Sequence, residues 1–273
     1  MDKELQMKVD KLQFLLKSYG CAAVAFSAGV DSTVLLKAAK DTLGAAQVIA
    51  LTVQSSLVPA SDVDDAVNFC RDEGIRHEVL QLDPLLYYDV RTNPPRRCYF
   101  CKRLVFGKLR EITGQKNIVH LLDGSNVDDG QDYRPGKQAL LELGVLSPLK
   151  EAGFTKADIR AYARELGLKV AQKPSAACLA SRIPYGEELS IEKLQRIEQA
   201  EKFLHEEGFV QLRVRSHEDM ARLELLPEDI ERFVADGIYE KAVRKLKELG
   251  FAYVTLDLEG YRMGSMNEVL RDK

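Results

Sequence analysis

The pattern of hydrophobic and polar positions switches repeatedly between two kinds of segment in the first half of the chain. Apolar residues recur at helical spacing in four segments, residues 4–18, 31–44, 61–73 and 99–114. Between them lie short apolar runs that predict strands, at residues 21–26, 47–53, 77–82 and 118–122. The run at 21–26 fits a strand that is buried on both faces. Strands that alternate with helices predict an α/β fold built on a doubly wound parallel sheet.

The second half of the chain has a different order of elements. A long amphipathic helix is predicted at 190–207, followed by strands at 210–214 and 221–225, helices at 228–233 and 238–249, and a strand at 253–258. This order indicates a smaller α+β domain. The boundary falls near residues 170–188, and we place the two domains at 1–175 and 176–273.

Composition narrows the class of protein. The chain has 273 residues, 45% of them hydrophobic, and a net charge of −3. This charge does not favour a nucleic-acid partner. We find no apolar run of membrane-spanning length and no signal-peptide core, so we expect a cytoplasmic protein without a membrane anchor. Five cysteines in such a protein are expected to be metal ligands or reactive thiols rather than disulfides.

The first candidate site is the turn from Ser27 to Ser32, between the strand at 21–26 and the next helix. Its small residues and the helix start at Asp31 and Ser32 place free N–H groups and the helix dipole where an anion can bind, and Gly29 permits close approach. The turn resembles the SGGxDS signature of the PP-loop ATP pyrophosphatases. Ala28 stands where that signature has glycine, which is tolerable if its φ is negative. The alternative is an ordinary strand and a serine-capped helix.

A second polar loop follows the fourth predicted strand, from Asp123 to Asp129. Its carboxylates, with Asp128 among them, are suited to hold Mg²⁺ on the phosphates of ATP, and Gly124 permits close approach to a nucleotide. In doubly wound sheets, ligands bind beyond the carboxyl ends of the strands. We therefore expect the first turn, the strand end at Val53, and Gly124, Asn126 and Asp128 to form one ATP pocket. The alternative is an ordinary polar turn.

Three cysteines form the third signal. Cys98 and Cys101 are three residues apart at a predicted helix start and are flanked by arginines and lysines, which favour thiolates. Cys178 lies in an irregular loop, whereas Cys21 and Cys70 fit buried core positions. A CxxC pair alone is compatible with a redox pair, half a zinc site or simple packing. Three thiolates leave one metal position open and favour an iron–sulfur cluster or zinc.

Several runs together resemble one family, the LarE family of ATP-dependent sulfur transferases. They are the Asp123–Gly136 run, Ser147-Pro148-Leu149, the CLASRIPYG loop that begins at Cys178, and Arg213-Val214-Arg215. The resemblance extends from about residue 20 to residue 266 of the chain.

This resemblance implies that ATP adenylates a carboxylate of a pyridinium-3,5-biscarboxylic acid mononucleotide and that sulfur then replaces the activated oxygen. In one branch of the family a single cysteine gives up its sulfur. In the other, three cysteines bind a 4Fe-4S cluster that transfers sulfur from a sulfide donor. Cys98, Cys101 and Cys178 match the cluster branch, and sacrifice of Cys178 is the main competitor. The resemblance also implies a homo-oligomer.

Arginines form the last group of candidates. Arg213 and Arg215 project from one face of a predicted strand, where they are suited to clamp a substrate phosphate. Arg134 and Arg182 are candidates for the same role. The alternative is a solvated charged face.

Three other functions remain compatible with the sequence. The runner-up is a PP-loop transferase that thiolates tRNA, but the acidic balance of the chain and the absence of paired CxxC zinc ribbons argue against it. An amide ligase such as an NAD or GMP synthetase would use ammonia. A nucleotide sensor would bind ATP without releasing pyrophosphate.

Overall fold

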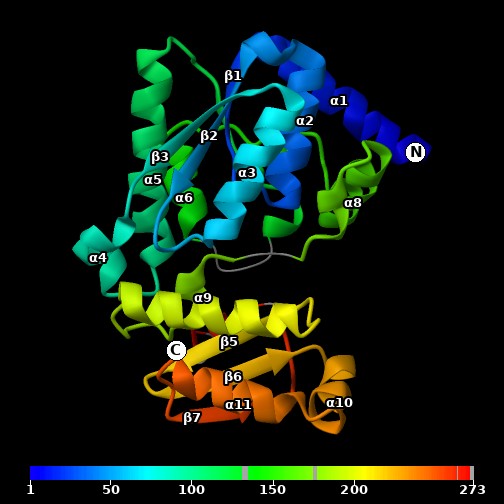
Figure 1. Cartoon of the computed structure of the whole chain (residues 1–273). Helices are drawn as coiled ribbons and strands as arrows, with labels where there is room; N and C mark the ends of the chain where they lie inside the picture. The colour runs from blue at the N-terminus through cyan, green and yellow to red at the C-terminus, as the bar shows by residue number, and fades with distance from the viewer. Residues whose placement is uncertain (131–134, 175–176, 263, 271–273) are drawn as a thin grey trace. The chain divides into compact units, whose positions relative to one another are not determined.

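The computed structural model describes residues 1–130, 135–174, 177–262 and 264–270 (Figure 1). The chain divides into two compact units. The first contains Met1–Pro84 and Arg96–Ala176, and the second contains Leu85–Pro95 and Ala177–Lys273. The sequence placed the divide between residues 175 and 176. The structure places it one residue later and assigns an additional short segment, 85–95, to the second unit.

The first unit is built on a four-stranded parallel sheet. Its strands are β1 (Ala22–Ala25), β2 (Val48–Gln54), β3 (Arg76–Gln81) and β4 (Leu121–Leu122), in the order β3-β2-β1-β4. The chain builds outward from β1 through β2 to β3 and then returns to place β4 on the other side of β1. The order therefore reverses between β1 and β4, which is the place where ligands bind in doubly wound sheets.

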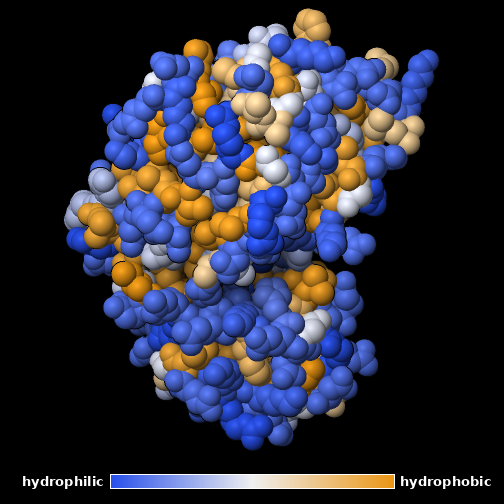
Figure 2. Space-filling view, turned by 45° about the horizontal axis from the view of Figure 1, so that its top comes forward, coloured by the Kyte–Doolittle hydropathy of each residue, from blue (hydrophilic) through white to orange (hydrophobic). Residues whose placement is uncertain are grey.

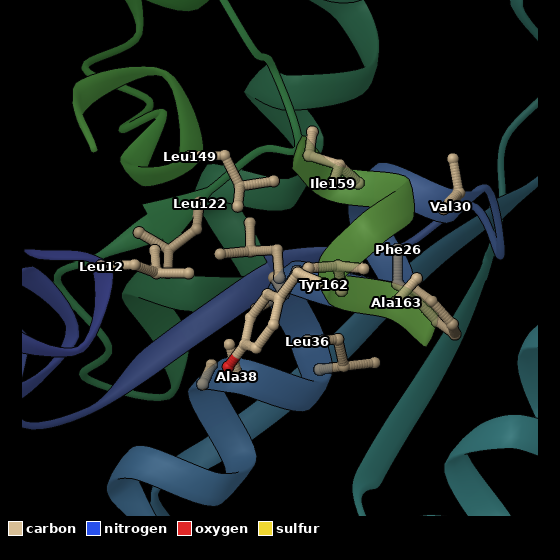
Figure 3. Close-up of a cluster of buried hydrophobic side chains, with 14 of the residues drawn as sticks. Leu12, Phe26, Val30, Leu36, Ala38, Leu122, Leu149, Ile159, Tyr162 and Ala163 are labelled. Atoms are coloured by element: carbon tan, nitrogen blue, oxygen red, sulfur yellow. The ribbon is translucent and has the colours of Figure 1, made fainter. Parts of the chain in front are cut away.

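Helices cover both faces of this sheet. They are α1 (Lys3–Tyr19), α2 (Val30–Leu43), α3 (Ala60–Glu73), α5 (Arg97–Gln115), α6 (Gly136–Glu142), α7 (Pro148–Glu151) and α8 (Lys156–Glu165). Side chains from α1, α2, α7 and α8 pack with Leu122 of β4 and with Phe26 in one core (Figure 3). Alternate strand residues such as Ala23 and Ile49 face a second core with α5 and α6. The predicted α/β class is confirmed.

Two predicted helix starts were wrong in detail. Helix α2 begins at Val30 with Gly29 as its N-cap, and Ser32 lies inside the first turn, where its hydroxyl donates back to the Gly29 carbonyl. Helix α3 begins at Ala60 after Pro59, one residue before the predicted segment 61–73. Proline has the dihedral angle and the missing N–H that suit a helix start. Strand β4 is also shorter than the apolar run that predicted it.

The second unit contains a three-stranded sheet in the order β5-β6-β7. Its elements are α4 (Tyr88–Arg91), the short 3-10 helix η5 (Leu179–Arg182), α9 (Ile191–Glu206), β5 (Leu212–His217), β6 (Met220–Leu225), α10 (Pro227–Ala235), α11 (Ile238–Glu248) and β7 (Tyr253–Leu256). Strands β5 and β6 are antiparallel, whereas β6 and β7 are parallel. One sheet face packs its apolar residues against α9, α10 and α11. That the second unit is a separate α+β domain stays a prediction.

The surface carries scattered apolar side chains. On the face drawn in Figure 2, hydrophobic residues form separate patches among hydrophilic ones. The most exposed large hydrophobic residues come from distant parts of the chain: Phe14, Leu86, Tyr88, Val119, Leu141 and Leu258. In the described part of the chain, no helix combines the length and the apolar character needed to cross a membrane.

Candidate active site

The predicted phosphate-binding turn lies at the carboxyl end of β1, where the order of the sheet reverses. The Ser32 hydroxyl accepts a hydrogen bond from the N–H of Ser27 at 3.3 Å and donates to the carbonyl of Gly29 at 3.1 Å. Thr33 donates from its hydroxyl to the same carbonyl at 2.8 Å. These contacts fold the turn around the amino end of α2. The first N–H groups of a helix have no partner within it and are available to an anion.

Ala28 adopts a backbone conformation that the sequence did not predict. Its φ is +54°, in the left-handed region, whereas a negative φ would have made alanine equivalent to the glycine of the PP-loop signature. An L residue with a Cβ atom costs about 1–2 kcal/mol in this region. The turn is therefore strained at Ala28, and such strain persists at functional sites only where the surroundings hold the backbone in place.

The two carboxylate oxygens of Asp31 differ in their hydrogen bonding. Lys156 at the start of α8 donates to Oδ2 of Asp31. Oδ1 is buried and has no hydrogen-bond partner among the described residues. Burial raises the pKa of Asp31 above its ordinary value, although the charge of Lys156 and its hydrogen bond partly offset this rise. A buried carboxylate oxygen without a partner is suited to Mg²⁺, which uses one or two protein carboxylates together with substrate phosphates.

The loop after β4 packs directly on this turn. A Cβ atom added to Gly124 would lie 2.9 Å from the backbone nitrogen of Ser32, so only glycine fits here without displacement. Asp123 fixes the start of the loop by accepting hydrogen bonds from the hydroxyls of Ser125 and Ser147, each at 2.5 Å. The sequence predicted close approach of Gly124 to a nucleotide. The structure shows close approach of Gly124 to the amino end of α2.

The remaining acidic residues of the loop have partners within the protein. The amide N–H of Asn126 donates to the carboxylate of Asp129 at 3.0 Å, and the N–H of Asp129 donates to the side-chain oxygen of Asn126 at 3.3 Å. Asp128 accepts from the N–H of Lys156 at 2.7 Å and so caps α8. The predicted nucleotide contacts of Asn126 and Asp128 stay predictions. Val53 lies at the carboxyl end of β2, next to β1 in the sheet.

Two of the three predicted cluster ligands lie together. Cys98 and Cys101 are three residues apart in the first turns of α5, so they share one side of the helix. Nη2 of Arg97 donates to the sulfur of Cys98 at 3.7 Å. Cys70 lies in the hydrophobic core of the first unit, and burial raises the pKa of its thiol to about 12. This agrees with the prediction that Cys70 is a core residue.

Cys178 belongs to the second unit, where its thiol is exposed and its backbone is anchored. Nη1 of Arg182 donates to the carbonyls of Ala177 and Cys178, at 2.7 and 3.2 Å. The other nitrogens of this guanidinium form two hydrogen bonds of 2.9 Å with Glu201 of α9. Arg182 thus fixes the loop from which the thiol of Cys178 projects.

Arg182 is part of a buried set of charged residues that we call the arginine layer: Arg182, Glu201, Arg213, Arg215 and Glu224. Arg215 forms two hydrogen bonds of 2.9 Å with Glu224 and donates to the carbonyl of Ser181 at 2.7 Å. Arg213 lies on the same strand face, and its guanidinium is 5.2 Å from the ring centroid of Tyr261.

The strand spacing correctly placed Arg213 and Arg215 on one face, but this face is buried and not solvated. For Arg182 and Arg215, the geometry favours an anchoring role in the fold. Their predicted contact with a substrate phosphate stays a prediction. Arg134, the fourth candidate, lies outside the described residues.

Across the residues that the structure describes, no three His, Cys, Asp or Glu side chains are grouped so as to hold a metal ion. The three-cysteine ligand set therefore stays a prediction.

The sequence interpretation overlooked Lys156, the partner of Asp31. A signal was present, because Thr155 and Asp158 form a capping box at the start of α8. The pattern of Thr, two residues and Asp ahead of Ile159 and Tyr162 predicts a helix start at this position.

Comparisons with known proteins agree with this geometry. Residues 4–93 match the family model of NAD synthase. The fold, the turn at the switch point and this match define a PP-loop enzyme that uses ATP.

Over its full length the chain is similar to more specific relatives. It is 38% identical to the pyridinium-3,5-bisthiocarboxylic acid mononucleotide synthase of Lactiplantibacillus plantarum, over 97% of this chain and 96% of that protein. It is also 42% identical to a protein of Synechocystis sp., over 97% of this chain and 99% of that one. A protein of Methanocaldococcus jannaschii is 29% identical over 88% of this chain and 90% of its own length. The chain belongs to the family of pyridinium-3,5-bisthiocarboxylic acid mononucleotide synthases, the LarE family.

Proposed function

We propose that this protein is an ATP-dependent sulfurtransferase that converts pyridinium-3,5-biscarboxylic acid mononucleotide into its thiocarboxylate form. The observation that carries the proposal is the 38% identity to the pyridinium-3,5-bisthiocarboxylic acid mononucleotide synthase of Lactiplantibacillus plantarum, over nearly the whole of both chains. The match to NAD synthase covers residues 4–93 alone, whereas the identity to the synthase extends over nearly the whole chain, so the match does not favour an amide ligase.

The proposed reaction has two stages, adenylation of the substrate and transfer of sulfur. A substrate carboxylate oxygen attacks the α-phosphorus of ATP, and pyrophosphate leaves. The turn at Ser27–Ser32 and the amino end of α2 are placed to stabilise the negative charge that develops on pyrophosphate. A sulfur nucleophile then attacks the acyl carbon, AMP leaves, and a thiocarboxylate remains. Asp31 would hold Mg²⁺, which neutralises phosphate charge when bound.

We propose in addition that Cys98, Cys101 and Cys178 hold a 4Fe-4S cluster. The donor chemistry fits, because two thiols share one side of α5 beside a cationic neighbour and the third thiol is exposed. When bound, such a cluster would supply an open iron site for the sulfide that is transferred. The competing arrangement is attack by the Cys178 thiolate on the acyl carbon, followed by cleavage of its Cβ–S bond.

Three further expectations belong to this proposal. The cluster requires an external sulfide donor, and we expect identical subunits to assemble. We also expect a cytoplasmic location, with which the five free cysteines agree, because thiols stay reduced there.

The experiment is an assay of the purified chain with ATP, Mg²⁺ and the biscarboxylate mononucleotide. We expect pyrophosphate release that depends on the mononucleotide, and a product in which sulfur replaces oxygen in the mass spectrum. Release that depends instead on ammonia and a dinucleotide substrate would indicate an amide ligase. Release stimulated by tRNA would indicate a tRNA thiolase, and ATP binding without any release would indicate a sensor.

Anaerobic purification tests the cluster. We expect about four iron atoms per chain, lost in Cys98→Ala but retained in Cys70→Ala. An iron-free protein that loses the mass of one sulfur atom per turnover would establish sacrifice of Cys178.

A further inference from the structure

Lys173 connects the phosphate-binding turn with α3. It follows the short 3-10 helix η4 (Lys169–Gln172), and its ammonium group donates to Asp62 at 2.9 Å and to Asp65 at 2.8 Å. The same nitrogen lies 3.4 Å from the carbonyl oxygen of Ala28. A single charged group therefore contacts both the first turns of α3 and the one strained residue of the turn.

The backbone that carries this lysine is itself fixed. Nη1 of Arg160 donates to the carbonyl of Ala171 at 2.6 Å, and Nη2 donates to the carbonyl of Lys173 at 2.9 Å. Burial alone would lower the pKa of Lys173, but its hydrogen bonds with Asp65 and Asp62 raise it above the ordinary value. The ammonium group is therefore charged at neutral pH.

We propose that Lys173 is a positioning residue that sets the phosphate-binding turn in its ATP-binding conformation. The proposal rests on the function proposed above. In a trans peptide the C=O and N–H groups point in opposite directions. An Ala28 carbonyl that faces Lys173 therefore directs the N–H of Gly29 to the other side, as part of the concave N–H surface that binds an anion.

The left-handed conformation of Ala28 makes this contact necessary. Alanine leaves that region readily, whereas glycine populates it at no steric cost. In the PP-loop signature the glycine adopts this conformation without a steric cost. Here the charge of Lys173 takes over that task, and the carboxylates of Asp62 and Asp65 fix the position of the charge.

The test compares ATP kinetics in three variants. In Lys173→Gln we expect the KM for ATP to rise about tenfold, with kcat changed less than about twofold, because only the turn is displaced. Lys169→Gln is the matched control, since Lys169 is exposed and lies in the adjoining 3-10 helix. We expect its KM to equal that of the wild type. Adding Ala28→Gly to Lys173→Gln should restore most of the lost affinity, because glycine needs no external support for a positive φ.

Two results would overturn the proposal. One is a KM for ATP in Lys173→Gln no higher than in Lys169→Gln. The other is a rise in KM that Ala28→Gly fails to reverse, which would make Lys173 a structural ion-pair partner only. If Lys173→Gln does not fold, Lys173→Arg tests the same contact, since it keeps the charge. A KM within about threefold of the wild type then supports the proposal, and a tenfold rise contradicts it.

Calorimetric binding of ATP with Mg²⁺ separates this proposal from the proposed function. If the wild type binds ATP but releases no pyrophosphate with the mononucleotide, the proposed function fails. In that case, the affinities of Lys173→Gln and of Lys173→Gln with Ala28→Gly for ATP, compared by calorimetry, still decide the role of Lys173.

Discussion

The phosphate-binding turn and the arginine layer are both polar, but their hydrogen bonding differs. In the turn, Oδ1 of Asp31 is buried without a partner among the described residues, and Ala28 is strained. In the layer, Arg182 forms five hydrogen bonds and Arg215 forms four with described residues, all within the second unit.

This difference distinguishes a ligand site from a scaffold. A buried polar atom without a partner costs free energy that a bound ligand can recover, and Oδ1 of Asp31 lies at the edge of the sheet where ligands bind. A guanidinium whose donors are already bonded to carboxylates and carbonyls has little left to offer a substrate. Its effect is to fix the backbone around it, here the loop that carries Cys178.

The largest effect is expected from breaking the arginine layer. Arg182→Met removes the ion-pair partner of the buried Glu201 carboxylate, which keeps its hydrogen bond from the N–H of Val214, and should lower the free energy of unfolding by about 3–5 kcal/mol. Urea unfolding measures this change. Replacing both partners with Met should restore much of the loss, because neither charge of this pair is then left buried without its partner.

The control for this prediction is the ion pair of Arg91 and Glu188, which lies in the same unit but is exposed. Arg91→Met should cost less than about 1 kcal/mol. Equal losses in the two single variants would contradict the view that the arginine layer is a scaffold.

The next effect concerns the open oxygen of the turn. Asp31→Asn removes the negative charge that we assign to Mg²⁺ binding and should slow pyrophosphate release about a hundredfold. Burial penalises a neutral amide less than a charged carboxylate, so Asp31→Asn should not lower the free energy of unfolding as strongly as it slows the reaction. Asp41→Asn, in the exposed pair with Lys37 on the same helix, should retain full activity. Activity retained in Asp31→Asn would contradict the assignment.

A smaller effect is expected at Ala28. Ala28→Gly relieves the cost of a positive φ but increases the flexibility of the unfolded chain, so the net gain in unfolding free energy should be about 0.5–1 kcal/mol. Denaturant unfolding measures it, with Ala38→Gly inside α2 as the control that should destabilise. A loss of stability in Ala28→Gly would show that alanine fits this turn without strain.

The sequence predicted the phosphate-binding turn better than it predicted the arginine layer. The turn at Ser27–Ser32 and the CxxC pair are local patterns, in which spacing alone places the chemical groups. Periodicity likewise gave the order of strands and helices, and hence the edge of the sheet at which Asp31 and Gly124 meet.

The roles of Arg182 and Arg215 depend on partners that spacing does not reveal. Glu201 comes from α9 and Glu224 from the neighbouring strand, so only tertiary packing shows that these guanidinium groups are already engaged. The φ of Ala28 was equally inaccessible, because alanine's own preference is for the opposite sign. Lys173 also escaped notice, since its contacts lie more than 100 residues away.

The last expected effect is a pH dependence of the stability of the arginine layer. Burial alone would raise the pKa of Glu201, but the charge of Arg182 and its hydrogen bonds hold it below the ordinary value of 4.5. The ionised carboxylate therefore stabilises the fold above this pH, and that contribution is lost as the pH falls through the lowered pKa. A tenfold difference in proton affinity between the folded and unfolded states corresponds to about 1.4 kcal/mol of stability.

Unfolding free energies measured between neutral pH and the acid range should thus fall less steeply in the Arg182→Met/Glu201→Met variant than in the wild type. Glu206→Gln on the same helix is the control, because Glu206 is exposed and its removal should leave the slope almost unchanged. If the double variant kept the wild-type slope, Glu201 would not be ionised in the fold. The layer would then be held together by neutral hydrogen bonds and not by paired charges.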